Sequence, residues 1–133
     1  MKQKPIEVVA AILRLPNGKV LVGKRRKTDT NAGKWEFPGG KVIAGETDDQ
    51  ALRREIMEEL EIEISNFSLF DEVSHDYPTY SVRIKFYLVD VGQGISPKKF
   101  SHDELQWIDP RQNTTLDFLE ANEAVLQKLT ILM

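Results

Sequence analysis

Residues 39–62, GGKVIAGETDDQALRREIMEELEI, limit the possible folds of this chain more than any other stretch. Their second half reads as an amphipathic helix, because apolar side chains recur every four residues at Leu52, Ile56 and Leu60. Three carboxylates at i, i+3 and i+4 spacing project from a neighbouring side of this helix: Glu55, Glu58 and Glu59. The fold must therefore pack one face of the helix on a core and present concentrated negative charge beside it.

The acidic cluster has two explanations. A solvated acidic face is the simple one, although like charges at i,i+4 destabilise a helix by roughly 0.2–0.5 kcal/mol per pair. A site for hard divalent cations, which take carboxylate oxygens, is the alternative. The neighbouring residues favour the cation site, because a glycine-rich turn at 39–45 lets backbone approach a ligand. In addition, Arg54 can hold Glu58 four residues later. Thr47 and Gln50 form a capping box that marks the helix start.

The stretch resembles the Nudix box, Gly-x5-Glu-x7-Arg-Glu-U-x-Glu-Glu-x-Gly-U, where U is a bulky aliphatic residue. Eight of the nine specified positions in residues 40–62 match: Gly40, Glu46, Arg54, Glu55, Ile56, Glu58, Glu59 and Ile62. Glu61 stands where the family has its second glycine, and we expect a left-handed helix end there. The resemblance implies the Nudix fold, an α/β/α sandwich with a mixed β-sheet between helices.

Length and composition fit one small domain over residues 1–133, with 41% hydrophobic and 29% charged residues. The net charge of −3 argues against a protein that holds duplex nucleic acid by its phosphates. The absence of cysteine excludes a disulfide framework and a thiolate site. No apolar run approaches the roughly 18 residues of a membrane span, so we expect no membrane partner and a cytoplasmic location.

The remaining chain reads as an α+β arrangement of strands, helix, strands and helix. Alternating apolar and polar residues predict that the strand at 80–91 is half-buried. Residues 92–104 read as a loop, and a second helix over 117–130 includes Phe118 on its apolar face. The predicted strands cover residues 6–15, 19–25, 35–37, 67–77, 80–91 and 105–108.

Hydrolysis of a phosphoanhydride needs divalent cations to neutralise the phosphates and activate water. Glu58 and Glu59 are the best candidates for direct ligands of Mg²⁺, with Mn²⁺ as the alternative metal. Glu55 is either a further ligand or the base that orients water. Arg54 would hold a catalytic glutamate, and Glu46 would tie the glycine turn to the helix start. The resemblance adds a backbone carbonyl from the glycine pair as a metal ligand: Gly39 or Gly40.

The family usually recruits one more carboxylate from a later loop. Where many members read Glu-His before a Trp-containing strand, this chain has Ser101 and His102. Asp103 or Glu104 can supply the missing oxygen, or the role can be absent. We expect His102 and His75 to be surface or loop residues and not ligands, because nothing else builds a metal site around them.

A narrower resemblance, to the MutT-type branch, rests on residues 34–42, 66–73 and 116–129. In that branch an asparagine near the start of the last helix reads the purine edge, and Asn122 occupies the matching place. Arg25 matches a basic residue of the nucleotide site, whereas Tyr80 replaces an arginine that contacts the nucleotide. The resemblance also implies that the segment after residue 34 lines the nucleotide pocket: Glu36, Phe37, Pro38 and Gly39.

The leading hypothesis is therefore an Mg²⁺-dependent nucleotide pyrophosphohydrolase. It would cleave a nucleoside triphosphate, such as 8-oxo-dGTP, to the monophosphate and pyrophosphate, as a monomer or a homodimer. A hydrolase of a nucleoside diphosphate linked to another group, such as ADP-ribose, is one alternative. A non-catalytic nucleotide-binding regulator is another, and the intact set of box glutamates argues against it.

Overall fold

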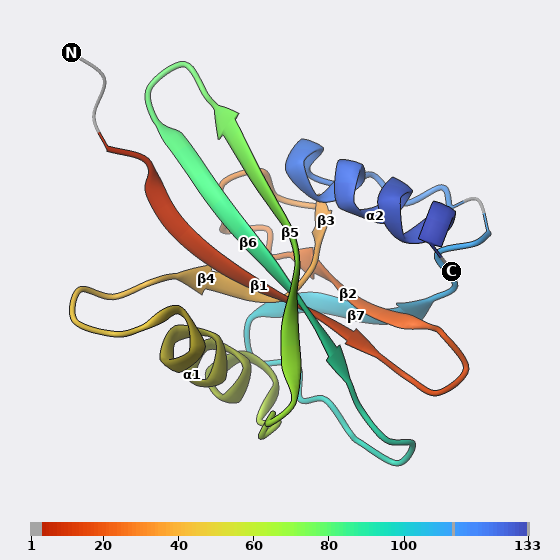
Figure 1. The fold of residues 1–133 in the computed structure, drawn as a ribbon. Coiled ribbons are helices and arrows are strands. Elements are labelled where there is room, and N and C mark those ends of the chain that lie inside the picture. Colours follow the sequence, from red (N-terminus) through yellow and green to blue (C-terminus); the bar gives the residue numbers. More distant parts are fainter. Residues whose placement is uncertain (1–3, 113, 133) are drawn as a thin grey trace.

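The computed structural model describes residues 4–112 and 114–132, and its elements are labelled in Figure 1. Four strands come first: β1 (Ile6–Arg14), β2 (Val20–Arg25), β3 (Trp35–Glu36) and β4 (Gly39–Lys41). The first helix, α1 (Asp48–Leu60), follows them. Three more strands come next: β5 (Phe67–Asp76), β6 (Ser81–Asp90) and β7 (His102–Ile108). The second helix, α2 (Glu120–Leu132), follows them. No helix in this described part is long and apolar enough to cross a membrane.

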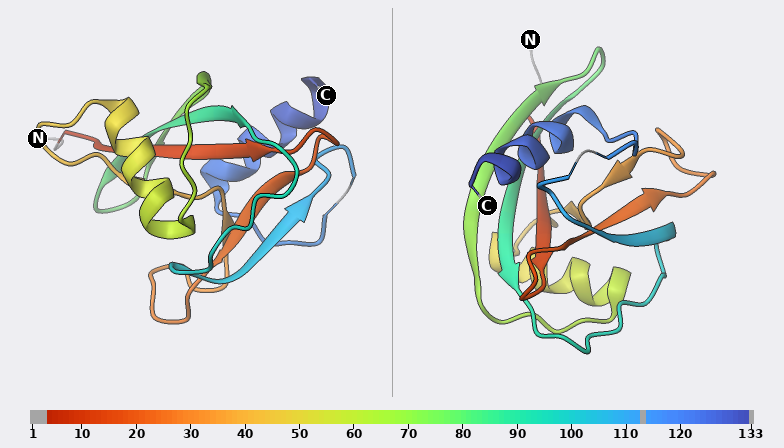
Figure 2. Two further views of the ribbon diagram at one scale, coloured as in Figure 1. Left: turned by 90° about the horizontal axis from the view of Figure 1, so that it is seen from below. Right: turned by 90° about the vertical axis from the view of Figure 1, so that its right-hand side faces the viewer.

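The strands of the described residues form one seven-stranded sheet. The mixed sheet is as predicted, but β4 is a strand that the six predicted strands do not include. Its path runs β3-β2-β1-β6-β5, with β4 added to β1 and β7 added to β2. The pairing of β1 with β6 is parallel, and the other pairings are antiparallel. In the right-hand view of Figure 2, β5 and β6 lie on one side of the molecule, and β2 and β7 diverge from them on the other.

The two helices cover opposite faces of this sheet, on either side of β1 (Figure 1). Successive residues of β1 point to alternate faces, so the strand contributes to two cores. Val9, Ala11 and Leu13 pack with α1 in one core, and Ala10 and Ile12 pack with α2 in the other. This arrangement confirms the predicted α/β/α sandwich.

Helix α1 begins and ends as its local sequence predicts. The Thr47 hydroxyl accepts from the Gln50 backbone N–H at 3.2 Å, and the Gln50 side chain accepts from the Thr47 N–H at 2.9 Å. At the other end Glu61 lies in the left-handed region with φ 56° and ψ 44°. Both ends are therefore fixed locally, which sets the rotation of the helix and the direction of its glutamates.

The glycine pair is the first correction to the predicted structure. Gly39 and Gly40 lie in β4, antiparallel to Ala10 and Val9 of β1, and not in a turn. A Cβ on Gly39 would lie 2.0 Å from the Val9 carbonyl oxygen. The glycine is needed because two backbones meet here, which hydrophobic periodicity does not reveal.

Three other element predictions were wrong in part. Strand β6 is half-buried only in its first part, where Val82 is buried and Arg83 is exposed; further along, Tyr87 and Val89 are buried in the core under α1. Strand β7 begins at His102, inside the predicted loop, because it pairs with β2. Phe118 precedes α2 and forms a bridge with Trp35 instead of lying on the helix.

Candidate active site

Arg54 is the centre of the charged surface of α1. Its guanidinium donates to both carboxylate oxygens of Glu46, at 2.6 and 3.0 Å. It also donates to Glu55 at 3.0 Å and to Glu58 at 3.2 Å, and to the Lys41 carbonyl oxygen at 3.1 Å. One arginine therefore holds three glutamates of the box and the end of β4; the contact with Glu58 is the one that helical spacing predicts.

Glu46 ties the end of β4 to the start of α1. Its carboxylate accepts from the Ile43 backbone N–H at 2.7 Å as well as from Arg54. The Arg54 hydrogen bonds, followed by the Ile43 N–H, lower the pKa of Glu46 to about 2. The same pairing raises the pKa of Arg54. Both groups are thus charged throughout the physiological range, and they form the support for the acidic cluster.

Glu59 is the buried member of the acidic cluster. Its side chain is only 8% exposed, and its Oε2 has no hydrogen-bond partner in the described part of the chain. Burial raises the pKa of Glu59, and the carboxyls of Glu55 and Glu36 raise it further, against a lowering by the Gly39 N–H. A carboxylate in this place has too little positive charge around it.

Gly40 makes the room that Glu55 occupies. A Cβ on Gly40 would lie 2.5 Å from the carboxyl carbon of Glu55. The Glu55 side chain is 15% exposed, so it lies against β4 and away from bulk water. The packing explains why this position of the motif is glycine.

These residues fit a hard divalent cation. Glu55, Glu58 and Glu59 supply carboxylate oxygens, which are the ligands that Mg²⁺ prefers. The unpartnered Oε2 of Glu59 is the kind of buried atom that a cation would compensate. In residues 4–112 and 114–132, no three acidic or histidine side chains are gathered closely enough to form a complete site. Metal binding would therefore draw the glutamates together.

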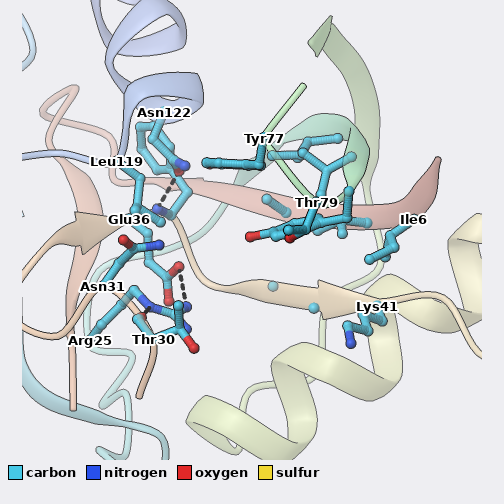
Figure 3. Close-up of a pocket in the computed structure, with 18 residues that line it drawn as sticks. Ile6, Arg25, Thr30, Asn31, Glu36, Lys41, Tyr77, Thr79, Leu119 and Asn122 are labelled. Carbon is cyan, nitrogen blue, oxygen red and sulfur yellow. Dashed lines mark hydrogen bonds and ion pairs between the residues drawn. The ribbon is translucent and has the colours of Figure 1, made fainter. Parts of the chain in front are cut away.

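A cavity of about 660 Å³ opens beside this cluster (Figure 3). Its size is that of a small-molecule site. Five of the six residues predicted to bind nucleotide line it: Arg25, Glu36, Phe37, Gly39 and Asn122. Gly40 lines it too, so β4 lies between the cavity and the glutamates. Pro38 is buried outside the lining, and its carbonyl accepts from the Ala11 N–H at 2.8 Å.

Asn122 reaches the cavity from the start of α2 (Figure 3). Its Oδ1 accepts from the Phe37 backbone N–H at 2.9 Å, and the side chain is buried. The acceptor is therefore engaged, and the two N–H bonds of Nδ2 remain for a ligand. A ligand acceptor facing Asn122 would take up these N–H bonds.

Two tyrosines of the β5–β6 connection also line the cavity, and sequence reasoning did not pair them. Tyr77 and Tyr80 stack with ring centroids 4.8 Å apart and an interplanar angle of 22°. Figure 3 shows Tyr77 across the cavity from Arg25 and Glu36. The sequence contains a feature that could have predicted this pair: the two tyrosines flank Pro78 and Thr79, and a tight turn brings its two ends together.

The predicted surface position of His102 is also wrong. It is buried, not a surface residue, and lies in a strand. Its Nε2 lies 3.0 Å from Glu36 Oε2 and 3.9 Å from Glu59 Oε1. Glu36 also accepts from Arg25 at 3.0 Å. His75 likewise lies in a strand, β5, where it is half-buried and 3.5 Å from the carboxylate of Glu120.

The candidates for the late-loop carboxylate point elsewhere. Asp103 accepts from the Lys27 backbone N–H at 3.1 Å, and Glu104 pairs with Lys24 at 3.6 Å. Both are exposed, and neither contacts a box glutamate in the described residues. The geometry disfavours a metal-binding role for either.

Comparison with known proteins identifies the chain. A family model described as NUDIX domain matches residues 9–128. The chain belongs to the Nudix family. It is 33% identical to an 8-oxo-dGTP diphosphatase of Escherichia coli over 126 residues, which is 95% of this chain and 97% of that protein. A shorter match, 53% over 60 residues, is to a CTP pyrophosphohydrolase of the same organism and covers 45% of this chain and 44% of that one.

The structural comparison agrees. A MutT structure from work on Aliivibrio salmonicida and Vibrio cholerae superposes with a TM-score of 0.81 at 30% identity. The match covers 98% of this chain and 100% of that one. These findings confirm the predicted MutT-type branch, the Nudix fold and the class of enzyme, a Nudix hydrolase that cleaves phosphoanhydrides.

Proposed function

We propose that this Nudix hydrolase cleaves a nucleoside triphosphate to the monophosphate and pyrophosphate, with Mg²⁺ as its cofactor. The observation that carries the proposal is the position of β4. Gly39 and Gly40 line the nucleotide-sized cavity on one side and adjoin Glu59 and Glu55 on the other. A nucleoside held in the cavity would extend its phosphates past this strand to the carboxylates.

The box glutamates would divide the chemistry between them. A bound divalent cation supplies neutralisation of the phosphate charge and acidification of water. Glu58 and Glu59 would hold it, and Glu55 would hold it or accept the proton of the attacking water. Arg54 fixes the directions of Glu55 and Glu58 through hydrogen bonds of 3.0 and 3.2 Å. Pyrophosphate then leaves as the phosphoanhydride bond breaks.

The base end of the cavity would discriminate by two features. Asn122 offers donors, because its acceptor is engaged by Phe37. A base edge with a carbonyl or ring-nitrogen acceptor would satisfy it. Tyr80, which is 38% exposed and lines the cavity, offers a ring face for stacking. Oxidised purines are a natural candidate, because relatives are named for 8-oxo-dGTP. Cytidine triphosphate belongs in the same test because of the shorter match.

A product assay tests the proposal. Purified protein is incubated with Mg²⁺ and, separately, 8-oxo-dGTP, dGTP, dATP, CTP, dCTP and ADP-ribose, and products are resolved by anion-exchange chromatography. We expect monophosphate and pyrophosphate in equal amounts from at least one triphosphate, and none after chelation or in Glu59→Gln. Preferential cleavage of ADP-ribose would establish the alternative of a linked nucleoside diphosphate. Tight nucleotide binding without any cleavage would establish the non-catalytic regulator.

A further inference from the structure

His102 is placed inside the protein by an irregularity in β7. In a regular strand its side chain would share the outward face of Glu104 and Gln106, which are exposed. The pairing with β2 shifts by one residue: Lys24 lies opposite Glu104, but Arg25 lies opposite His102. Asp103 is therefore skipped in the strand pairing. A one-residue bulge turns the following side chain to the other face. It is this bulge that directs the imidazole inward.

A glycine on the neighbouring strand leaves room for that imidazole. Gly23 follows three buried aliphatic residues of β2, where a glycine weakens the strand. A Cβ on Gly23 would lie 2.6 Å from His102 Cδ2 and 2.9 Å from Nε2. Any other residue here would push the ring out of its place. The sequence therefore keeps an unfavourable residue at one position to seat the histidine at another.

The buried ring connects the two halves of the site. Arg25 Nη1 lies 3.0 Å from Glu36 Oε1, and the other oxygen of Glu36 lies 3.0 Å from His102 Nε2. The same Nε2 lies 3.9 Å from Glu59 Oε1, while Nδ1 has no partner in the described residues. A purely structural core position would favour an apolar side chain, because an unpartnered buried nitrogen destabilises the folded state.

We propose that His102 is a positioning residue, which holds Glu36 and Glu59 at the junction of the nucleotide cavity and the metal-binding helix. The inference rests on the proposed function for the roles of those two carboxylates. Loss of the imidazole would leave Glu59 free to turn away from the cation. Groups that orient ligands in this way typically change metal affinity or activity by about 10–100-fold when they are replaced.

Metal binding without nucleotide provides a test that does not depend on turnover. Mn²⁺ alone is titrated into wild type, His102→Leu, His102→Gln and His75→Leu, and free Mn²⁺ is followed by electron paramagnetic resonance. We expect about tenfold weaker binding in the Leu variant. The Gln variant should recover most of it, because its amide nitrogen reaches the position of Nε2. The matched control His75→Leu should bind as wild type, since His75 contacts Glu120 and not the box. In turnover, kcat should fall in His102→Leu, and His75→Leu should turn over as wild type.

A second variant tests the same inference without removing any polar group. Gly23→Ala should weaken Mn²⁺ binding in the wild-type background and have little effect in a His102→Ala background, where no ring is displaced. Gly92→Ala is its control, because a Cβ there meets nothing within 4 Å. Gly23→Ala decides the matter alone if His102→Leu does not fold.

Three results would overturn the inference. They are wild-type binding in His102→Leu, no recovery in His102→Gln, or equal effects of Gly23→Ala in both backgrounds. The proposed function fails separately, if wild type binds no Mn²⁺ and releases no pyrophosphate.

Discussion

Replacing Glu59 by Gln should abolish turnover and at the same time make the metal-free protein more stable. The carboxyl is buried beside Glu55 and Glu36, and it has one oxygen without a partner. An amide of the same shape removes the buried acid while it keeps the volume. Activity is lost because a neutral amide is a poor ligand for a cation that must balance growing phosphate charge.

The size of the gain follows from proton linkage. The ordinary pKa of this carboxyl is 4.5, and burial raises the pKa in the folded protein. Between these two values the folded state binds more protons than the unfolded state, so stability falls as pH rises. The limiting slope is about 1.4 kcal/mol per pH unit, or roughly 2.7 kcal/mol from pH 6 to pH 8. Glu55 and Glu36 share part of this titration. We therefore expect Glu59→Gln to exceed wild type at pH 8 by about 1–2 kcal/mol in the free energy of unfolding, or roughly 3–8 °C in Tm.

Thermal melts in chelator across pH 5 to 8 would measure this difference. Wild type should lose Tm as pH rises, and Glu59→Gln should lose less and melt higher at pH 8. Glu58→Gln is the control, because that side chain is 59% exposed and removing it relieves no burial. Added Mg²⁺ should raise the Tm of wild type by RT ln(1 + [Mg²⁺]/Kd), and that of the Gln variant far less. Parallel pH profiles for wild type and Glu59→Gln would refute the reasoning.

Other substitutions test separate features. Glu61→Gly should raise Tm by the equivalent of about 1 kcal/mol in the free energy of unfolding, because Glu61 has a φ of 56° that glycine adopts without strain. An unchanged Tm would mean that interactions of the Glu61 side chain offset the backbone strain. Asn122→Asp keeps the acceptor for the Phe37 N–H and loses the Nδ2 donors. It should therefore lower kcat/KM for the nucleotide with the preferred base, by the equivalent of about 1–3 kcal/mol of transition-state stabilisation, and affect nucleotides with other bases less. An equal fall for all bases would make Asn122 a structural residue. Gly40→Ala should lower kcat at least tenfold and retain nucleotide binding by fluorescence titration, because its Cβ would displace the Glu55 carboxyl; full activity would show that Glu55 need not lie against β4.

The parts of the site that the sequence predicts are those fixed within one segment. The capping box at Thr47, the contact of Arg54 with Glu58 and the left-handed Glu61 all depend on neighbours within a few residues. Helical spacing alone therefore predicts that Arg54 reaches Glu58.

The missed parts depend on pairing between distant segments. Gly39 lies in a strand because β1, about thirty residues earlier, offers it a partner. His102 is buried because β2 imposes a bulge on β7 and Gly23 leaves it room. Periodicity reports which side of an element a residue occupies, but not where strand register changes. The register of β7 with β2 therefore cannot be read from the sequence alone.

The contacts of Trp35 and Phe37 with the end of the chain set an order on the assembly of the site. The Trp35 N–H donates to the Asp117 carbonyl oxygen, the Leu119 N–H donates to the Trp35 carbonyl oxygen, and Phe37 meets Asn122 across 85 positions of sequence. During synthesis the glutamates of α1 emerge long before these partners. The nascent chain can therefore present its acidic helix while the wall that would hold a base is still missing. On the proposed function, a nascent chain would bind the base only after residues 117–122 have left the ribosome and docked.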